Sequence, residues 1–71
     1  MTQNELDVLI KIAPAIGKID SGCGTCAGRF LRHVAGLLET NSTEMKEVIR
    51  IACEGLDESV SDISDTVDRK E

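Results

Sequence analysis

Two cysteines, Cys23 and Cys26, stand two residues apart in the stretch GCGTCAGR, and their type and spacing are the strongest sign of chemistry in this chain. A Cys-x-x-Cys pair on a tight turn supplies two thiolates to one tetrahedral zinc ion, so it forms half of many structural zinc sites. A complete site needs further ligands, for which the chain offers Cys53 and His33. One hypothesis is therefore a zinc-clipped interaction module that uses Cys23, Cys26 and Cys53.

The spacing Cys-x2-Cys-x6-His-x19-Cys matches no standard zinc finger. If Cys26 already lies in a helix, His33 stands two turns further along, about 10 Å away at the helical rise per residue. The favoured interpretation is that Cys23 and Cys26 begin a helix and that Cys53 packs as a small apolar side chain. In this interpretation the protein needs no cofactor.

Redox catalysis and phosphate binding are two other functions that this stretch could have, but each needs neighbouring secondary structure that the sequence does not predict. Redox pairs of the thioredoxin type follow a β-strand within a βαβ unit, whereas the preceding segment IKIAPAIGKID is an apolar stretch interrupted by proline. The glycines of GCGTCAG resemble a phosphate loop only loosely, because no strand precedes them and no Gly-Lys-Ser/Thr follows. Neither redox catalysis nor phosphate binding is therefore expected.

The length and composition predict an all-α fold. A chain of 71 residues buries only about 60% of its unfolded surface, and a closed catalytic pocket is hard to build at that size, so we expect no enzyme. Apolar content drawn from Leu, Ile, Val and Ala, with Phe30 the single aromatic residue, suits helix packing. We expect a small domain of two or three helices, with a helical core domain at residues 1–56 and an acidic heptad-patterned helix or frayed tail at 57–71.

Three helical segments are predicted. The first covers residues 4–13, with Asn4 as its N-cap and Pro14 stopping or kinking it. The second covers about residues 25–39 and ends at the TNS that follows. The third opens at Ser42 or Thr43, and apolar residues then recur in steps of four and three, as in a heptad seam. The members of this seam are Ile49, Cys53, Leu56, Val60, Ile63 and Val67.

The helical pattern also predicts which residues form the core. The second segment carries two adjacent apolar rows, which together make a wide apolar arc. We expect the core to consist mainly of Phe30, Val34, Leu37, Leu38, Ile49 and Leu56.

Charge is distributed unevenly along the chain, whose net charge is −5. Residues 1–38 carry four bases against three acids, whereas residues 39–71 carry ten acids against four bases. An acidic chain disfavours direct binding to nucleic-acid phosphates. A larger protein with a basic surface, such as an enzyme that handles nucleic acid, is the expected partner. The candidate partner-binding residues are Arg29, Arg32, His33, Asp57, Glu58, Asp62 and Asp65.

These features predict a small non-enzymatic regulatory protein that binds and modulates a larger protein, in size and character like a phage-type modulator of host transcription or defence machinery. A homodimer formed through the heptad seam is an alternative. The first apolar run, LDVLIKIAPAI, is interrupted by charge and is too short to cross a membrane. Three cysteines, an odd number, favour a reducing cytoplasmic location over a disulfide-stapled secreted domain.

Overall fold

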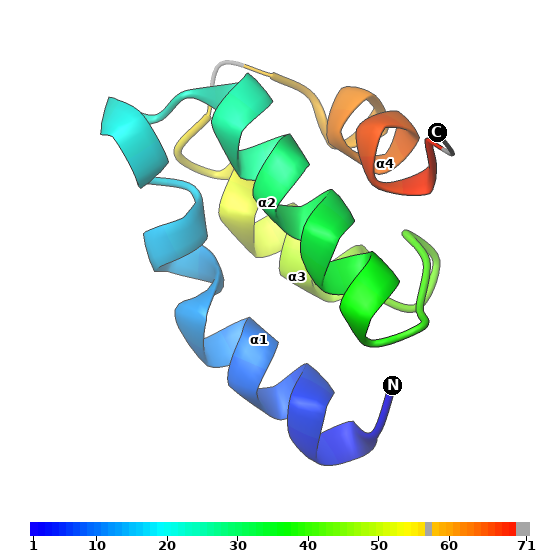
Figure 1. Ribbon diagram of the computed structural model, residues 1–71. Coiled ribbons are helices and arrows are strands. Elements are labelled where there is room, and N and C mark those ends of the chain that lie inside the picture. The colour runs from blue at the N-terminus through cyan, green and yellow to red at the C-terminus, as the bar shows by residue number, and fades with distance from the viewer. Residues whose placement is uncertain (57, 70–71) are drawn as a thin grey trace.

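The computed structural model describes residues 1–56 and 58–69, and this part of the chain forms four α-helices and one short 3-10 turn (Figure 1). The elements are α1 (Gln3–Ile16), the turn η1 (Ile19–Ser21), α2 (Gly24–Leu37), α3 (Lys46–Cys53) and α4 (Val60–Asp68). The predicted all-α class is confirmed. The predicted number of helices was too low, because the segment expected to form the third helix forms two.

Helix α1 begins earlier and ends later than predicted. Thr2, not Asn4, is its N-cap, and it forms a capping box in which the Thr2 hydroxyl accepts from the Glu5 N–H while the Glu5 carboxylate accepts from the Thr2 N–H. The helix continues through Pro14, and the Gly17 N–H still bonds to the Ala13 carbonyl at 3.1 Å. Proline removes one hydrogen-bond donor here, but the burial of the last residue of the helix holds the final turn in place.

The helices pack in two layers around one core. Helix α1 packs against α3, α2 packs against α4, and α3 also contacts α4. In Figure 1, α3 lies behind α1 and α2, and α4 lies beside α2. All four helices contribute to the buried core, which comprises Leu9, Ala13, Ile16, Ala27, Leu31, Ala35, Met45, Val48, Ile49, Ala52, Ile63 and Val67.

The predicted core was only partly correct. Ile49 is fully buried, and three of the other expected residues are half-buried: Val34, Leu38 and Leu56. Phe30 and Leu37, however, are exposed, with Leu37 keeping 82% of its surface in water.

The reason is that α2 turns its row of small residues toward α4. A Cβ built on Gly28 would stand 3.1 Å from Thr66 Cγ2, so the two helices approach closely there. Ala27, Leu31 and Ala35 fill the interface. The apolar arc of α2 is wider than the surface that the rest of the fold covers, and Phe30 and Leu37 lie on its exposed part.

The predicted heptad helix that runs from residue 43 to 67 was wrong, because the chain leaves the helix after Cys53. Leu56 N–H bonds back to the Cys53 carbonyl, and a new helix begins where the Ser59 hydroxyl accepts from the Asp62 N–H. Gly55 favours the break, since glycine is a poor helix former. The break lets α4 turn back onto α2, where it buries Ile63 and Val67.

The start of the same segment also differs from the prediction. Residues 42–45 form a turn in which the Glu44 N–H donates to the Asn41 side chain at 3.0 Å, and α3 starts only at Lys46. Met45, which the sequence pattern did not place in the core, is fully buried at this turn. None of the helices in the described residues has the length and apolar character needed to cross a membrane.

Candidate functional site

A left-handed turn leads the chain from η1 into α2. Asp20, Ser21 and Gly22 have φ values of 50°, 60° and 92°, so three consecutive residues lie in the left-handed region. The N–H groups of Gly22 and Cys23 both bond to the Ile19 carbonyl, at 3.1 and 3.0 Å. Two non-glycine residues in this conformation are uncommon, and the turn carries Asp20 back to the first turn of α2.

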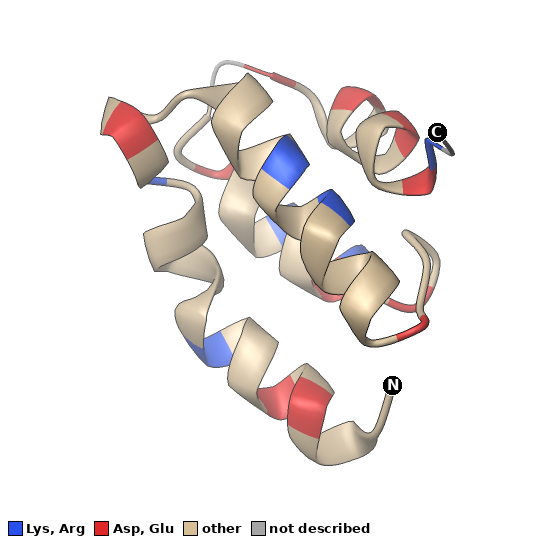
Figure 2. Cartoon of the chain, viewed as in Figure 1, with Lys and Arg blue, Asp and Glu red and all other residues tan. Residues whose placement is uncertain are grey.

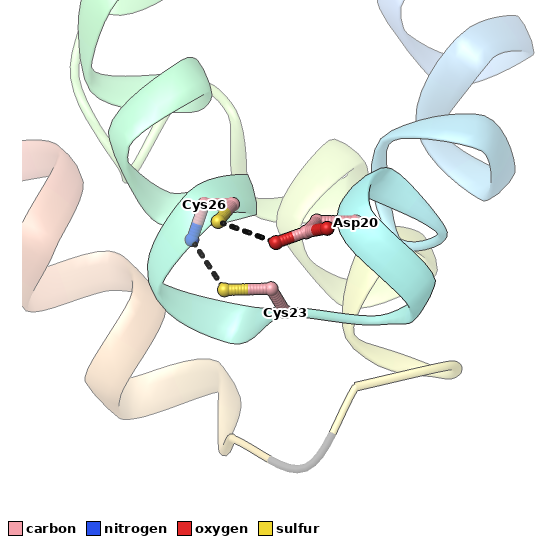
Figure 3. Close-up of side chains that lie close together, drawn as sticks. All are labelled: Asp20, Cys23 and Cys26. Atoms are coloured by element: carbon pink, nitrogen blue, oxygen red, sulfur yellow. Dashed lines mark hydrogen bonds between the residues drawn. The ribbon is translucent and has the colours of Figure 1, made fainter.

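Cys23 is the N-cap of α2, and its Sγ accepts a hydrogen bond from the Cys26 N–H at 3.2 Å (Figure 3). The Cys26 thiol in turn lies 3.8 Å from Asp20 Oδ2, to which it donates. The three ligand atoms all lie within 4.8 Å of one another. We call Asp20, Cys23 and Cys26 the thiol cluster. The expectation that the two cysteines begin a helix is confirmed.

The structure brings Asp20 to the cysteine pair in place of the other ligands that the sequence offered. Among the described residues, neither Cys53 nor His33 belongs to the thiol cluster. Cys53 lies half-buried at the end of α3, where burial and the nearby Glu58 carboxylate raise the pKa of its thiol. Sequence reasoning missed Asp20, although the signal was present as the pattern Asp-x2-Cys-x2-Cys.

The donor atoms of the thiol cluster suit a divalent cation. The hydrogen bond with Cys23, together with lost hydration and the charge of Asp20, raises the pKa of the Cys26 thiol to about 11. The thiol without a bound cation is therefore protonated and a weak nucleophile at neutral pH, and a cation would have to displace that proton, because the thiolate is both the nucleophile and the metal ligand. Two sulfurs and one carboxylate oxygen form a donor set that suits a borderline-soft divalent cation such as zinc.

A second candidate feature is a groove between α2 and α4 with a cavity of about 670 Å³. Arg29, Arg32 and His33 line it from α2, and Arg69 lines it from the end of α4. We call this the cationic groove; its remaining lining residues are Thr25, Glu58 and Thr66. Arg32, His33 and Arg69 also line the adjoining hollow toward residues 40–43.

The structure therefore places the three predicted basic-patch residues in one groove. Arg69 was missed, because its position depends on α4 folding back along α2, which the sequence pattern did not reveal. Lys18 directly precedes η1 and does not line the groove.

Of the described acidic residues assigned to partner binding, Glu58 precedes α4, and Asp62 and Asp65 lie on it. Glu58 is half-buried in the cationic groove, where it accepts a hydrogen bond from the Thr25 hydroxyl at 3.4 Å. Asp62 and Asp65 are exposed on α4, and Figure 2 shows acidic segments of α4 beside basic segments of α2. Asp57 lies outside the described residues.

Comparison of the chain with protein-family models, with curated proteins and with solved structures found no match. The cationic groove and the thiol cluster are thus the two features from which a function is inferred. They share no residue: the thiol cluster surrounds the start of α2, and the groove runs along α2 from Thr25 to His33.

Proposed function

We propose that this chain is a small non-enzymatic regulatory protein that docks on a larger protein, and that the cationic groove receives an acidic segment of that partner. The observation that carries the proposal is the convergence of Arg29, Arg32 and Arg69 from two helices on one groove. Such a concentration of positive charge is notable in a chain whose net charge is −5.

The chemistry of the groove suits carboxylates. An arginine guanidinium holds a carboxylate through two parallel hydrogen bonds, and arginine is enriched among residues that dominate interface energies. The threonine hydroxyls of Thr25 and Thr66 add neutral hydrogen-bonding groups along the same walls. A cavity of about 670 Å³ is large enough for a few side chains of an extended segment.

A short acidic segment fits this surface better than a nucleic acid does. A long polyanion leaving the groove would pass the acidic residues of α4, and an overall negative chain gains little from counterion release. A partner with acidic residues for the groove and basic residues facing Asp62 and Asp65 would match both signs of charge. Such a partner would still have the basic surface that the sequence led us to expect, as an enzyme that handles nucleic acid does. The cytoplasm is the proposed location.

The homodimer alternative is not favoured by the packing. Of the seam residues on which that dimer would depend, Ile49, Ile63 and Val67 are buried inside the molecule itself. The two helices that carry the seam do not form one continuous face.

The proposal is tested by charge reversal in the groove. Partners would be captured from source-cell lysate with three tagged proteins and then identified by quantitative mass spectrometry and cross-linking. The three proteins are the wild type, the groove variant Arg29→Glu/Arg69→Glu and the control Lys11→Glu/Lys18→Glu. The two variants make the same change in net charge, and both control lysines are exposed outside the groove.

We expect one stoichiometric partner that the control retains and the groove variant loses. Cross-links should map to a segment of the partner rich in Asp and Glu. The proposal is rejected if both variants retain the partner equally, if the cross-linked segment is basic, or if no stoichiometric partner is captured. A further variant, Asp62→Asn/Asp65→Asn, would be tested in the same experiment. It measures how much the acidic residues of α4 contribute to partner binding.

A further inference from the structure

We infer that the thiol cluster is a metal site, in which Asp20, Cys23 and Cys26 bind one zinc-type divalent cation through a carboxylate oxygen and two thiolates. This inference is independent of the proposed docking function, because none of the three residues lines the cationic groove.

The spacing of the ligand atoms matches what such an ion requires. Zinc–sulfur bonds of about 2.3 Å and zinc–oxygen bonds of about 2.0 Å in a tetrahedron separate a sulfur from an oxygen ligand by roughly 3.5 Å. Cys26 Sγ and Asp20 Oδ2 are 3.8 Å apart. All three ligand atoms stand within 4.8 Å of one another. Small side-chain rotations would bring them into contact with one ion.

The backbone brings the three ligands together from two neighbouring elements, η1 and the start of α2. Cys23 at the N-cap and Cys26 in the first turn of α2 are spaced so that the Cys26 N–H reaches the Cys23 sulfur. Asp20 arrives from the opposite direction through the left-handed turn at residues 20–22. Holding non-glycine residues in that conformation costs free energy, which metal coordination would offset. A bound ion would tie η1 to the first turn of α2.

The arrangement leaves one coordination position open. Asp20 is exposed and the two cysteines are half-buried, so the cluster borders on solvent. Water, or a ligand from another molecule, would complete a four-coordinate ion, since three protein ligands plus an open position is a recurring zinc arrangement.

The test uses the full chain, reduced and free of metal, titrated with Co²⁺ as a spectroscopic substitute for zinc. We expect one ion per chain, sulfur-to-cobalt charge-transfer absorption, intense d–d bands typical of tetrahedral coordination, and loss of both signals when Zn²⁺ is added. Because an ion bound to the folded state stabilises it, zinc should also raise the melting temperature.

Variants test whether Asp20, Cys23 and Cys26 are the metal ligands and whether residues outside the thiol cluster take part. Cys23→Ser and Cys26→Ser should each abolish the two-thiolate spectrum, and Asp20→Asn should weaken Co²⁺ binding at least tenfold. Cys53→Ser and Asp65→Asn are the matched controls and should bind as the wild type does. Serine is a favoured N-cap residue, so Cys23→Ser keeps the start of α2, which circular dichroism would verify.

Three results would overturn the inference. The first is a cobalt complex without thiolate absorption. The second is loss of binding in Cys53→Ser as great as that in Cys23→Ser. The third is unchanged affinity in Asp20→Asn, which would remove the carboxylate from the site.

Discussion

Gly17 lies directly against the backbone of Ala52: a Cβ built on Gly17 would stand 2.2 Å from the Ala52 carbonyl oxygen. The end of α1 therefore meets α3 with no room for a side chain. The backbone of Gly17 has φ −67°, so glycine is needed here for its small size and not for a left-handed conformation.

Gly17→Ala should therefore destabilise the protein strongly. The new methyl group meets backbone and not a flexible side chain, so the helices must move apart, at a cost of about 2–3 kcal/mol or more. Gly36→Ala is the control, because nothing lies within 4 Å of a Cβ at that helical position; it should stabilise by up to about 1 kcal/mol. Urea unfolding measures both, and equal effects would contradict the close approach of α1 and α3.

Leu31 and Leu37 lie on the same helix, but truncation of Leu31 should destabilise the protein far more than truncation of Leu37. Leu31 is fully buried, and Leu31→Ala should cost about 2–5 kcal/mol because it leaves a cavity in the core. Leu37 is 82% exposed, so Leu37→Ala should change stability by less than about 0.5 kcal/mol. If the two midpoints of unfolding shift alike, the orientation assigned to α2 is wrong.

Ser59→Ala tests whether α4 is a separate helix. The Ser59 hydroxyl caps α4 by accepting from the Asp62 N–H at 3.1 Å, so its removal should cost about 1 kcal/mol. If residues 43–67 formed one helix, alanine would instead be the better helix former and the variant would gain stability. Ser61→Ala, inside α4 and exposed, is the control and should be nearly neutral. Thermal unfolding of both variants shows whether each substitution raises or lowers the stability of the protein.

Asp68 should make stability depend on pH. Its carboxylate accepts from the Ser42 N–H at 2.8 Å and from the Ser42 hydroxyl, and these hydrogen bonds lower the pKa of Asp68 below its usual 3.8. A carboxyl group with a lowered pKa stabilises the fold above its usual pKa, and this contribution is lost as the pH falls through the lowered value.

The wild type should therefore be more stable than Asp68→Asn at neutral pH, by no more than about 1 kcal/mol because the group is exposed to solvent. The difference should shrink as the pH falls below the usual value of 3.8 and through the lowered pKa of Asp68. Urea unfolding at several pH values measures it, with Asp65→Asn as the control on the same helix. A difference that stays constant with pH would show that the Ser42 contact does not involve the charged carboxylate.

Local features of the chain were predictable from the sequence because they depend on residues close together. The all-α class followed from the apolar spacing and the composition, and the start of α2 at Cys23 and Cys26 followed from the small residues before an amphipathic pattern. The clustering of Arg29, Arg32 and His33 followed from helical periodicity.

Other features depended on how the helices fold back on one another. The wide apolar arc of α2 was consistent with several orientations, and only contact with α4 buried Leu31 and left Leu37 exposed. The seam between Ile49 and Val67 has the spacing of one long helix, yet burial of Ile63 and Val67 against α2 favours a break that periodicity alone does not show.

The sequence by itself thus determined the all-α class, the start of α2 at the cysteine pair and the grouping of basic residues on that helix, because propensity and periodicity act over a few residues. The tertiary structure alone decided what those residues meet. A left-handed turn carries Asp20 to Cys23 and Cys26. The return of α4 along α2 brings Arg69 into the groove that Arg29 and Arg32 line. Both arrangements depend on the path of the chain between elements, where small local differences in conformation redirect entire helices.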